Sequence, residues 1–295
     1  MGYIFLMIAL LAGATKGFCG KKTSGYTKQM GDAVFANWFR MLLCIVFGFF
    51  VVFVSGDLLQ LKPDAETLLI SVLSGFSSAI FVVTWLISVK KSAYMMLDIF
   101  LLLGILIPLI CSRLFFHEMI KATQWVGMAL LFAAVLIMCS YNNSIKEKID
   151  LTSFLLLLTC GASCGVADFS QKLFIKRVEG GSVAVFNFYT YVFAALVLTV
   201  AFLATRRDRA ERDKNSTRMI LVFIPIMAVC LFLNSFFKTL AAEHLDAILL
   251  YPLNQGCGLI LSSLMSVIFF KEKMNAKAII GIVTAFAGLL VINLL

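Results

Sequence analysis

The chain has 295 residues, of which 61% are hydrophobic and 14% are charged, and its mean hydropathy is +0.99. Soluble domains carry about 25% charged residues, so this composition excludes a water-soluble globular protein and indicates an integral membrane protein. The formal net charge is +9. The basic residues are concentrated in particular loops, so the positive charge indicates how the chain is oriented in the membrane. We therefore expect no nucleic-acid partner.

Ten apolar stretches follow one another along the chain, and the connections between them are short. Each stretch is close to the length of about 20 residues with which a helix crosses the hydrocarbon core and satisfies its own backbone hydrogen bonds. We therefore predict an all-α integral membrane protein with ten transmembrane helices and no separate soluble domain. The predicted spans are residues 3–20, 33–54, 67–89, 93–112, 122–140, 152–173, 184–205, 219–240, 248–270 and 276–293.

Lysine and arginine are concentrated in the loops that follow the odd-numbered spans. The positive-inside rule then places these loops in the cytoplasm and both chain termini outside. We expect a multi-pass protein of the cell membrane, specifically a bacterial plasma membrane, in direct contact with the lipid bilayer. Its oligomeric state does not follow from the sequence.

A long segment of the chain occurs twice. The residues from Ser112 to Cys139 recur without a gap as Ser266 to Asn293, and both copies carry a Phe-Phe-x-Glu turn followed by a glycine in the next span. Such self-similarity indicates duplication. We predict two repeats of five helices, residues 1–145 and 146–295, within one membrane unit.

An odd number of crossings determines how the two repeats are related. Five spans bring the chain to the opposite side of the membrane, so the second repeat starts from the other face. This predicts inverted topology, with a pseudo-two-fold axis in the membrane plane, which is typical of transporters that work by alternating access.

Several features resemble the EamA-like branch of the drug/metabolite transporter superfamily. The ten spans, Arg40 in the second span and the Glu turn before a glycine-bearing span all fit that branch. Spans one and six share a glycine-and-small-residue signature, Gly13-Ala14-x-x-Gly17 and Gly161-Ala162-x-x-Gly165. The resemblance implies a central cavity lined by spans one to four and six to nine, with spans five and ten at the periphery.

Charged residues inside the spans are the best candidates for substrate binding, because each costs a few kcal/mol or more in hydrocarbon unless it is paired or hydrated. Lys16 lies roughly 20 Å along a core of about 30 Å. One interpretation is a cavity cation that contacts a carboxylate or phosphate of the substrate. The alternative is an internal ion pair with Asp98 or Asp168.

The other charged candidates also have two interpretations. Asp98 and Asp168 could take up protons as the cavity alternates between the two sides, or they could form structural pairs. Lys172 and Lys238 lie near helix ends, from which a long side chain reaches the interface. Either could bind substrate, as could Arg40. Glu118 and Glu272 are explained by placement near a helix N-terminus.

Uncharged candidates lie mainly in span nine, where Pro252, two amides and two glycines occur close together. A span interrupted by proline or glycine is where transporters expose backbone to a substrate. Asn254 and Gln255 differ by about 100° around a helix, so one could face the cavity and the other a neighbouring helix. The alternative for this part of the span is close packing with an interhelical hydrogen bond. Trp85 and Tyr191 are the aromatic candidates for contact with a substrate. The alternative is that they anchor the protein at the membrane interface.

Metal and enzyme chemistry are not expected. The eight cysteines lie within or at the ends of the apolar stretches, without a redox or zinc spacing, and only two histidines occur. We expect no metal, no cofactor and no catalytic residue.

The predicted function is secondary active transport of a small polar metabolite, an anionic or zwitterionic solute such as an amino or organic acid, with a proton or a counter-solute as the candidate coupling partner. The alternatives are export of hydrophobic cations or drugs, and a non-transporting membrane sensor or partner subunit.

Overall fold

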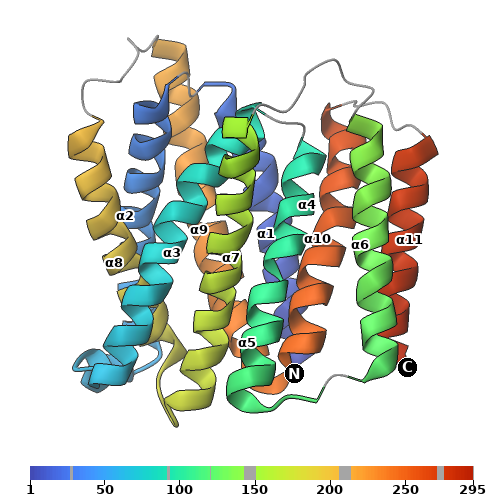
Figure 1. Ribbon diagram of the computed structural model, residues 1–295. Helices are drawn as coiled ribbons and strands as arrows, with labels where there is room; N and C mark the ends of the chain where they lie inside the picture. The colour runs from blue at the N-terminus through green and yellow to red at the C-terminus, as the bar shows by residue number, and fades with distance from the viewer. Residues whose placement is uncertain are drawn as a thin grey trace.

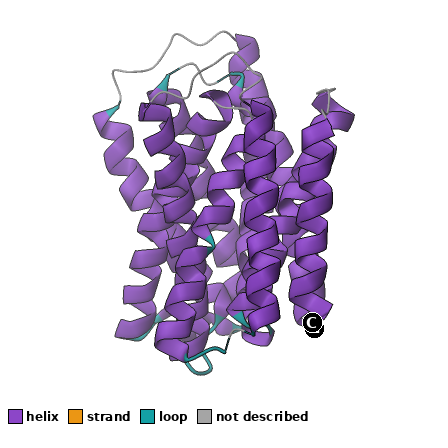
Figure 2. Cartoon of the chain, turned by 45° about the vertical axis from the view of Figure 1, so that its right-hand side comes forward, coloured by secondary structure: helices purple, strands orange, loops and turns teal. Residues whose placement is uncertain are grey.

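A computed structural model describes residues 1–26, 29–91, 94–119, 121–142, 151–205, 214–270 and 276–294. Within these ranges every regular element is helical, and the connections between the helices are short (Figure 2). The elements are α1 (Gly2–Ser24), α2 (Met30–Val54), η1 (Asp57–Leu61), α3 (Ala65–Lys91), α4 (Tyr94–Gly104), α5 (Leu106–Phe116), α6 (Ala122–Asn142), α7 (Leu151–Arg177), α8 (Val183–Ala204), α9 (Lys214–His244), α10 (Ala247–Phe270) and α11 (Ala276–Leu294).

The helices account for the ten predicted spans. Among the described residues, seven helices are long and apolar enough to cross a membrane. Spans four, five and ten coincide with shorter apolar helical segments, residues 100–116, 122–134 and 279–292. The all-helical membrane fold is therefore confirmed for the described residues. The basic loops at 143–150, 206–213 and 271–275, on which much of the predicted orientation rests, lie outside them.

The fourth span differs from the prediction of one continuous helix, because it divides into α4 and α5 at Ile105. Pro108 explains the division. Proline has no N–H to donate to the carbonyl four residues earlier, and its ring collides with that carbonyl, which here belongs to Gly104. The backbone N–H of Ile105 instead bonds to the oxygen of Leu102, three residues back, at 3.1 Å.

The main helix contacts join the first half of the chain to the second. α1 packs against α9, α3 against α7, α2 against α8, and α6 against α11. The α6–α11 pair stands at one edge of the bundle and the α2–α8 pair at the opposite edge (Figure 1). The halves therefore interlock and share one interior, which places the space between α1, α3, α7 and α9 at the centre.

Small residues let α4 and α7 touch at the level of the backbone. A methyl group built on Gly161 would overlap the carbonyl oxygen of Phe100, and one on Gly165 would overlap that of Gly104. Only glycine permits so close an approach of two helices. The repeated glycine signature of span six thus serves helix packing.

The C-terminal end of α7 lies at the end of the bundle where both termini lie (Figure 1), and Lys172 is near that end of the helix. Its ammonium, on α7, donates to the carbonyl oxygens of Ala242 at 3.1 Å and Leu245 at 2.7 Å, and it lies 3.3 Å from Oε1 of Glu118. Oε2 of Glu118 accepts the N–H of Ala247 at 2.9 Å. The ion pair therefore satisfies orphan backbone groups at the end of α9 and at the start of α10.

A second polar link holds the same end of the bundle. Ser182, the N-cap of α8, donates its hydroxyl to Asp57 at 2.6 Å and its backbone N–H to Gln60 at 2.8 Å. Tyr189 donates to the carbonyl oxygen of Leu61 at 2.8 Å. These contacts attach η1, from the first half of the chain, to α8 and the turn before it, from the second.

We predict that Lys172→Met destabilises the protein by about 3–5 kcal/mol, because the substitution leaves the Glu118 carboxylate without its cation in a buried site. Denaturant unfolding of the purified protein measures this change. Lys172→Met combined with Glu118→Gln should recover most of the loss. Lys176→Met, which removes an exposed lysine from the same helix, is the matched control. Equal stability of Lys172→Met and Lys176→Met would contradict the structural role.

Gly165→Ala should also lower the stability, since the added methyl pushes α7 away from the Gly104 carbonyl. Gly25→Ala is its control, because a methyl group there meets only ordinary van der Waals contact. A thermal melt of the two variants should show a lower midpoint for Gly165→Ala. An unchanged midpoint would show that the two backbones can separate without loss.

Candidate functional site

A cavity of about 130 Å³ lies inside the bundle. Its lining residues come from α1, α2, α3, α4, α7, α8, α9 and α10. None of the described lining residues belongs to α5, α6 or α11. This agrees with the family resemblance, which implies a central cavity with spans five and ten at the periphery.

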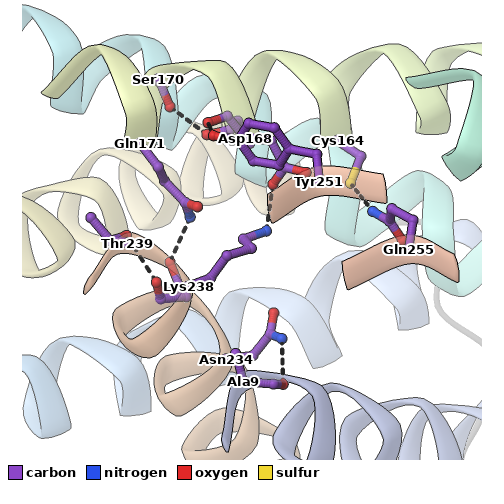
Figure 3. Close-up of polar contacts among 12 residues, drawn as sticks. Ala9, Cys164, Asp168, Ser170, Gln171, Asn234, Lys238, Thr239, Tyr251 and Gln255 are labelled. Carbon is purple, nitrogen blue, oxygen red and sulfur yellow. Dashed lines mark hydrogen bonds and ion pairs between the residues drawn. The ribbon is translucent and has the colours of Figure 1, made fainter. Parts of the chain in front are cut away.

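An ion pair between Asp168 and Lys238 crosses the cavity wall. Asp168, on α7, is 2% exposed, and its Oδ1 pairs with the ammonium of Lys238 on α9, which is 7% exposed (Figure 3). Tyr251, on α10, donates its hydroxyl to the backbone oxygen of Asp168 at 2.6 Å. Three helices thus meet at Asp168. Lys238, rather than Lys16, is the partner of this carboxylate.

Lys16 lines the cavity from α1 without a carboxylate partner among the described residues. Its ammonium lies 5.7 Å from the centre of the Phe81 ring, a cation–π distance. Asp98, the other predicted partner, belongs to α4, but its side chain lies outside the part of the chain that the structure describes. Lys16 is therefore a cavity cation that no described acid neutralises.

Both span-nine amides line the cavity, and Gln255 also faces the neighbouring helix α7, as the sequence suggested for one of the two. Gln255 lies with Nε2 3.7 Å from the sulfur of Cys164 (Figure 3). The predicted interruption of this span does not occur, because α10 runs unbroken from Ala247 to Phe270 across Pro252. Besides the two amides, α10 presents Gly258 and Ser262 to the cavity.

Trp85 and Tyr191 also line the cavity and are buried, so neither is an interfacial anchor. The hydroxyl of Tyr191 donates to the carbonyl oxygen of Leu231 at 3.3 Å. The indole of Trp85 fills the space beside Gly20 of α1, where a methyl group would collide with the ring. Both rings thus form part of the cavity wall.

Arg40 and Lys172 are the predicted site residues that the structure places away from the cavity lining. Arg40 is 2% exposed in α2, and its Nε has no hydrogen-bond partner among the described residues. Lys172 is engaged by Glu118 and by the end of α9. The remaining predicted residues with described side chains come together at the cavity.

Several polar lining residues of the site escaped the sequence prediction, among them Gln171, Asn234 and Ser235. Gln171 donates to Ser235 at 3.1 Å, and Ser235 donates to Asn187 at 2.7 Å. Asn234 donates to the carbonyl oxygen of Ala9 at 2.7 Å, which ties α9 to α1 (Figure 3). A signal existed, because Asn234 precedes Lys238 by one helical turn and so shares its face of α9.

The fold and the polar cavity define a multi-pass helical membrane protein with a solute-sized site between its two halves. The chain belongs to the EamA-like transporter family, whose model matches residues 1–140 and 151–294. It is therefore a membrane transporter of the drug/metabolite transporter superfamily, and this family consists of transporters, not enzymes.

Comparison with solved structures supports the fold. Twenty-eight chains match. One of them, described only as the crystal structure of a protein, superposes with a TM-score of 0.76 at 12% sequence identity, over 99% of this chain and 96% of that one. A likeness at this identity establishes the fold alone. No curated protein matches the chain.

Proposed function

We propose that the protein is a secondary active transporter of a small anionic or zwitterionic solute, such as an amino acid or an organic acid. The observation that carries this proposal is Lys16, a cation on the cavity wall without a described acidic partner. A charge at this depth of the membrane marks a substrate pathway unless the protein neutralises it. A carboxylate or phosphate of the solute supplies the missing negative charge.

The balance of charges in the cavity favours an anion over a cation. Its described lining residues include two lysines, Lys16 and Lys238, and one acid, Asp168. That acid is already paired with Lys238. A hydrophobic cation would have to displace an ammonium from a buried carboxylate, whereas an anion meets Lys16 directly. The amides of Asn254 and Gln255 are positioned to bond the polar remainder of the solute.

The size of the cavity supports a small metabolite. Sites for drug-sized ligands measure about 300–1,000 Å³. The cavity here measures about 130 Å³. This volume suits a solute of a few heavy atoms and argues against the alternative of drug export.

The proposed mechanism is alternating access between two inverted repeats, residues 1–145 and 146–295. The helix pairs support this relation. In the repeat relation, α1 corresponds to α7, α3 to α9 and α4 to α10. The contact between α1 and α9 therefore has its counterpart in the contact between α7 and α3. The contact between α1 and α10 likewise has its counterpart in the contact between α7 and α4. Two states with exchanged roles for the halves then have similar energies.

In one of these states the cavity is closed at the end of the bundle where both termini lie, and the two polar links hold it closed there. Glu118 and Lys172 belong to different halves, as do Asp57 and Ser182. Opening the cavity toward this end separates these pairs. By the positive-inside rule this end faces outside, in a bacterial plasma membrane.

We predict that small anions raise the melting temperature of the purified protein and that Lys16→Met abolishes the effect. A ligand that binds only the folded state stabilises it by mass action, by about 2.7 kcal/mol at a concentration of 100 Kd. Thermal shifts measured with L-glutamate, succinate, L-serine and inorganic phosphate provide the readout. Lys176→Met, an exposed lysine outside the cavity, should keep the shift.

Three outcomes would contradict the proposal. Lys16→Met could retain the thermal shift at the same half-saturating anion concentration, which would show that Lys16 does not bind the anion. Tetraphenylphosphonium could stabilise the protein while every anion and zwitterion fails, which favours cation export. Lastly, proteoliposomes could show no counterflow of any stabilising solute, which favours a sensor or partner subunit.

A further inference from the structure

We propose that Asp168 is the proton-binding group that couples anion transport to a proton gradient, with Lys238 as the link between proton and anion. This inference rests on the proposed transport of an anion. It follows from one geometric fact: the only acid among the described lining residues of the cavity is paired with a cation that lines the same cavity.

Few groups near Asp168 could replace Lys238 as its partner. The side chains around Asp168 are those of Lys238 on α9, Lys16 on α1, Tyr251 on α10 and Cys164, one turn earlier on α7. Tyr251 bonds the backbone oxygen of Asp168, so its hydroxyl does not serve the carboxylate.

The other helices that pack against α7 add no described charge at this point. The lining residues of α3 are Ser78, Phe81, Val82 and Trp85, which are uncharged. The side chain of Asp98 on α4 lies outside the described part, and Arg113 on α5 is exposed. Nearer the termini end, the Glu118 carboxylate is held by Lys172. Lys238 is thus the cation that neutralises Asp168.

An incoming anion competes with Asp168 for Lys238. Lys16 and Lys238 project from α1 and α9, which pack against each other, and both line the cavity. An anion between the two ammonium groups relieves their mutual repulsion and draws Lys238 toward itself. Asp168 would then be a buried carboxylate without a partner, which is among the most costly arrangements in a protein interior.

Protonation removes this cost. One proton from solution binds a carboxylate oxygen of Asp168, no other bond forms or breaks, and Lys238 remains an ammonium bound to the anion. Anion and proton therefore favour each other's binding, as linkage requires of two coupled ligands. A monoanion and one proton leave the net charge of the cavity unchanged, so the loaded and empty proteins cross between their two states with the same charge.

The test uses proteoliposomes with purified full-length protein and radiolabelled L-glutamate or inorganic phosphate, each assayed alone. Coupling of one proton to one monoanion predicts accumulation of about ten-fold for each unit of imposed pH gradient, since one unit corresponds to about 1.36 kcal/mol. Counterflow without a gradient reports transport itself. Asp168→Asn should retain counterflow and lose the accumulation driven by the pH gradient.

Matched variants keep the result interpretable. Glu66→Gln removes an exposed carboxylate of α3 and should accumulate anion as the unmodified protein does. Asp168→Glu should restore part of the coupling. Because Asp168→Asn leaves Lys238 unpaired and could fold poorly, Asp168→Asn with Lys238→Gln removes the whole pair. Because the double variant also lacks one of the two ammonium groups that bind the anion, its counterflow should require a higher anion concentration, and it should show no accumulation driven by the pH gradient.

Accumulation by Asp168→Asn or by the double variant at the level of the unmodified protein would overturn the inference. So would counterflow by the unmodified protein without any accumulation under a pH gradient. Absence of counterflow in the unmodified protein for both anions would instead contradict the proposed function. The two failures are therefore distinguishable.

Discussion

A charge inside a membrane span must be neutralised or hydrated, and this constraint organises the interior of the protein. Two buried lysines satisfy it in different ways. The Lys172 ammonium donates to two backbone carbonyls and pairs with Glu118, away from the cavity lining, so its contacts join helix ends. Lys238 depends on Asp168 and lines the cavity. The same chemistry therefore holds helix ends together at one site and forms part of the cavity wall at the other.

The halves of the chain share a frame but differ in the residues they present. In the repeat alignment, Lys16 on α1 corresponds to Cys164 on α7, and both line the cavity. At the offset of 154 residues that relates the two copies of the repeated segment, Thr84 on α3 corresponds to Lys238 on α9. Thr84, however, bonds the carbonyl of Ile80 in its own helix at 2.8 Å. The chemistry of the site thus lies at positions where the two halves differ, while Gly161, Gly165 and Glu118 serve packing.

Sequence reasoning predicted the spans and much of the cavity because hydrocarbon imposes simple rules. The length and apolar character of the stretches located the helices. The free-energy cost of burying a charge in hydrocarbon identified Lys16, Asp168 and Lys238 as candidate site residues. It could not assign partners, since Lys172 meets Glu118 only through the packing of α7 against the end of α5. Proline was equally ambiguous: α4 and α5 divide before Pro108, whereas α10 continues through Pro252. Tertiary contacts decide such cases, and a single sequence does not contain them.

An experimental structure with a bound anion tests the central claim most directly. With L-glutamate at a saturating concentration, the account predicts density in the cavity and a carboxylate oxygen within hydrogen-bond distance, about 2.7–3.2 Å, of the Lys16 ammonium. A ligand that binds away from Lys16, or that contacts Asp168 through a cationic group while Lys16 stays unengaged, would contradict the account.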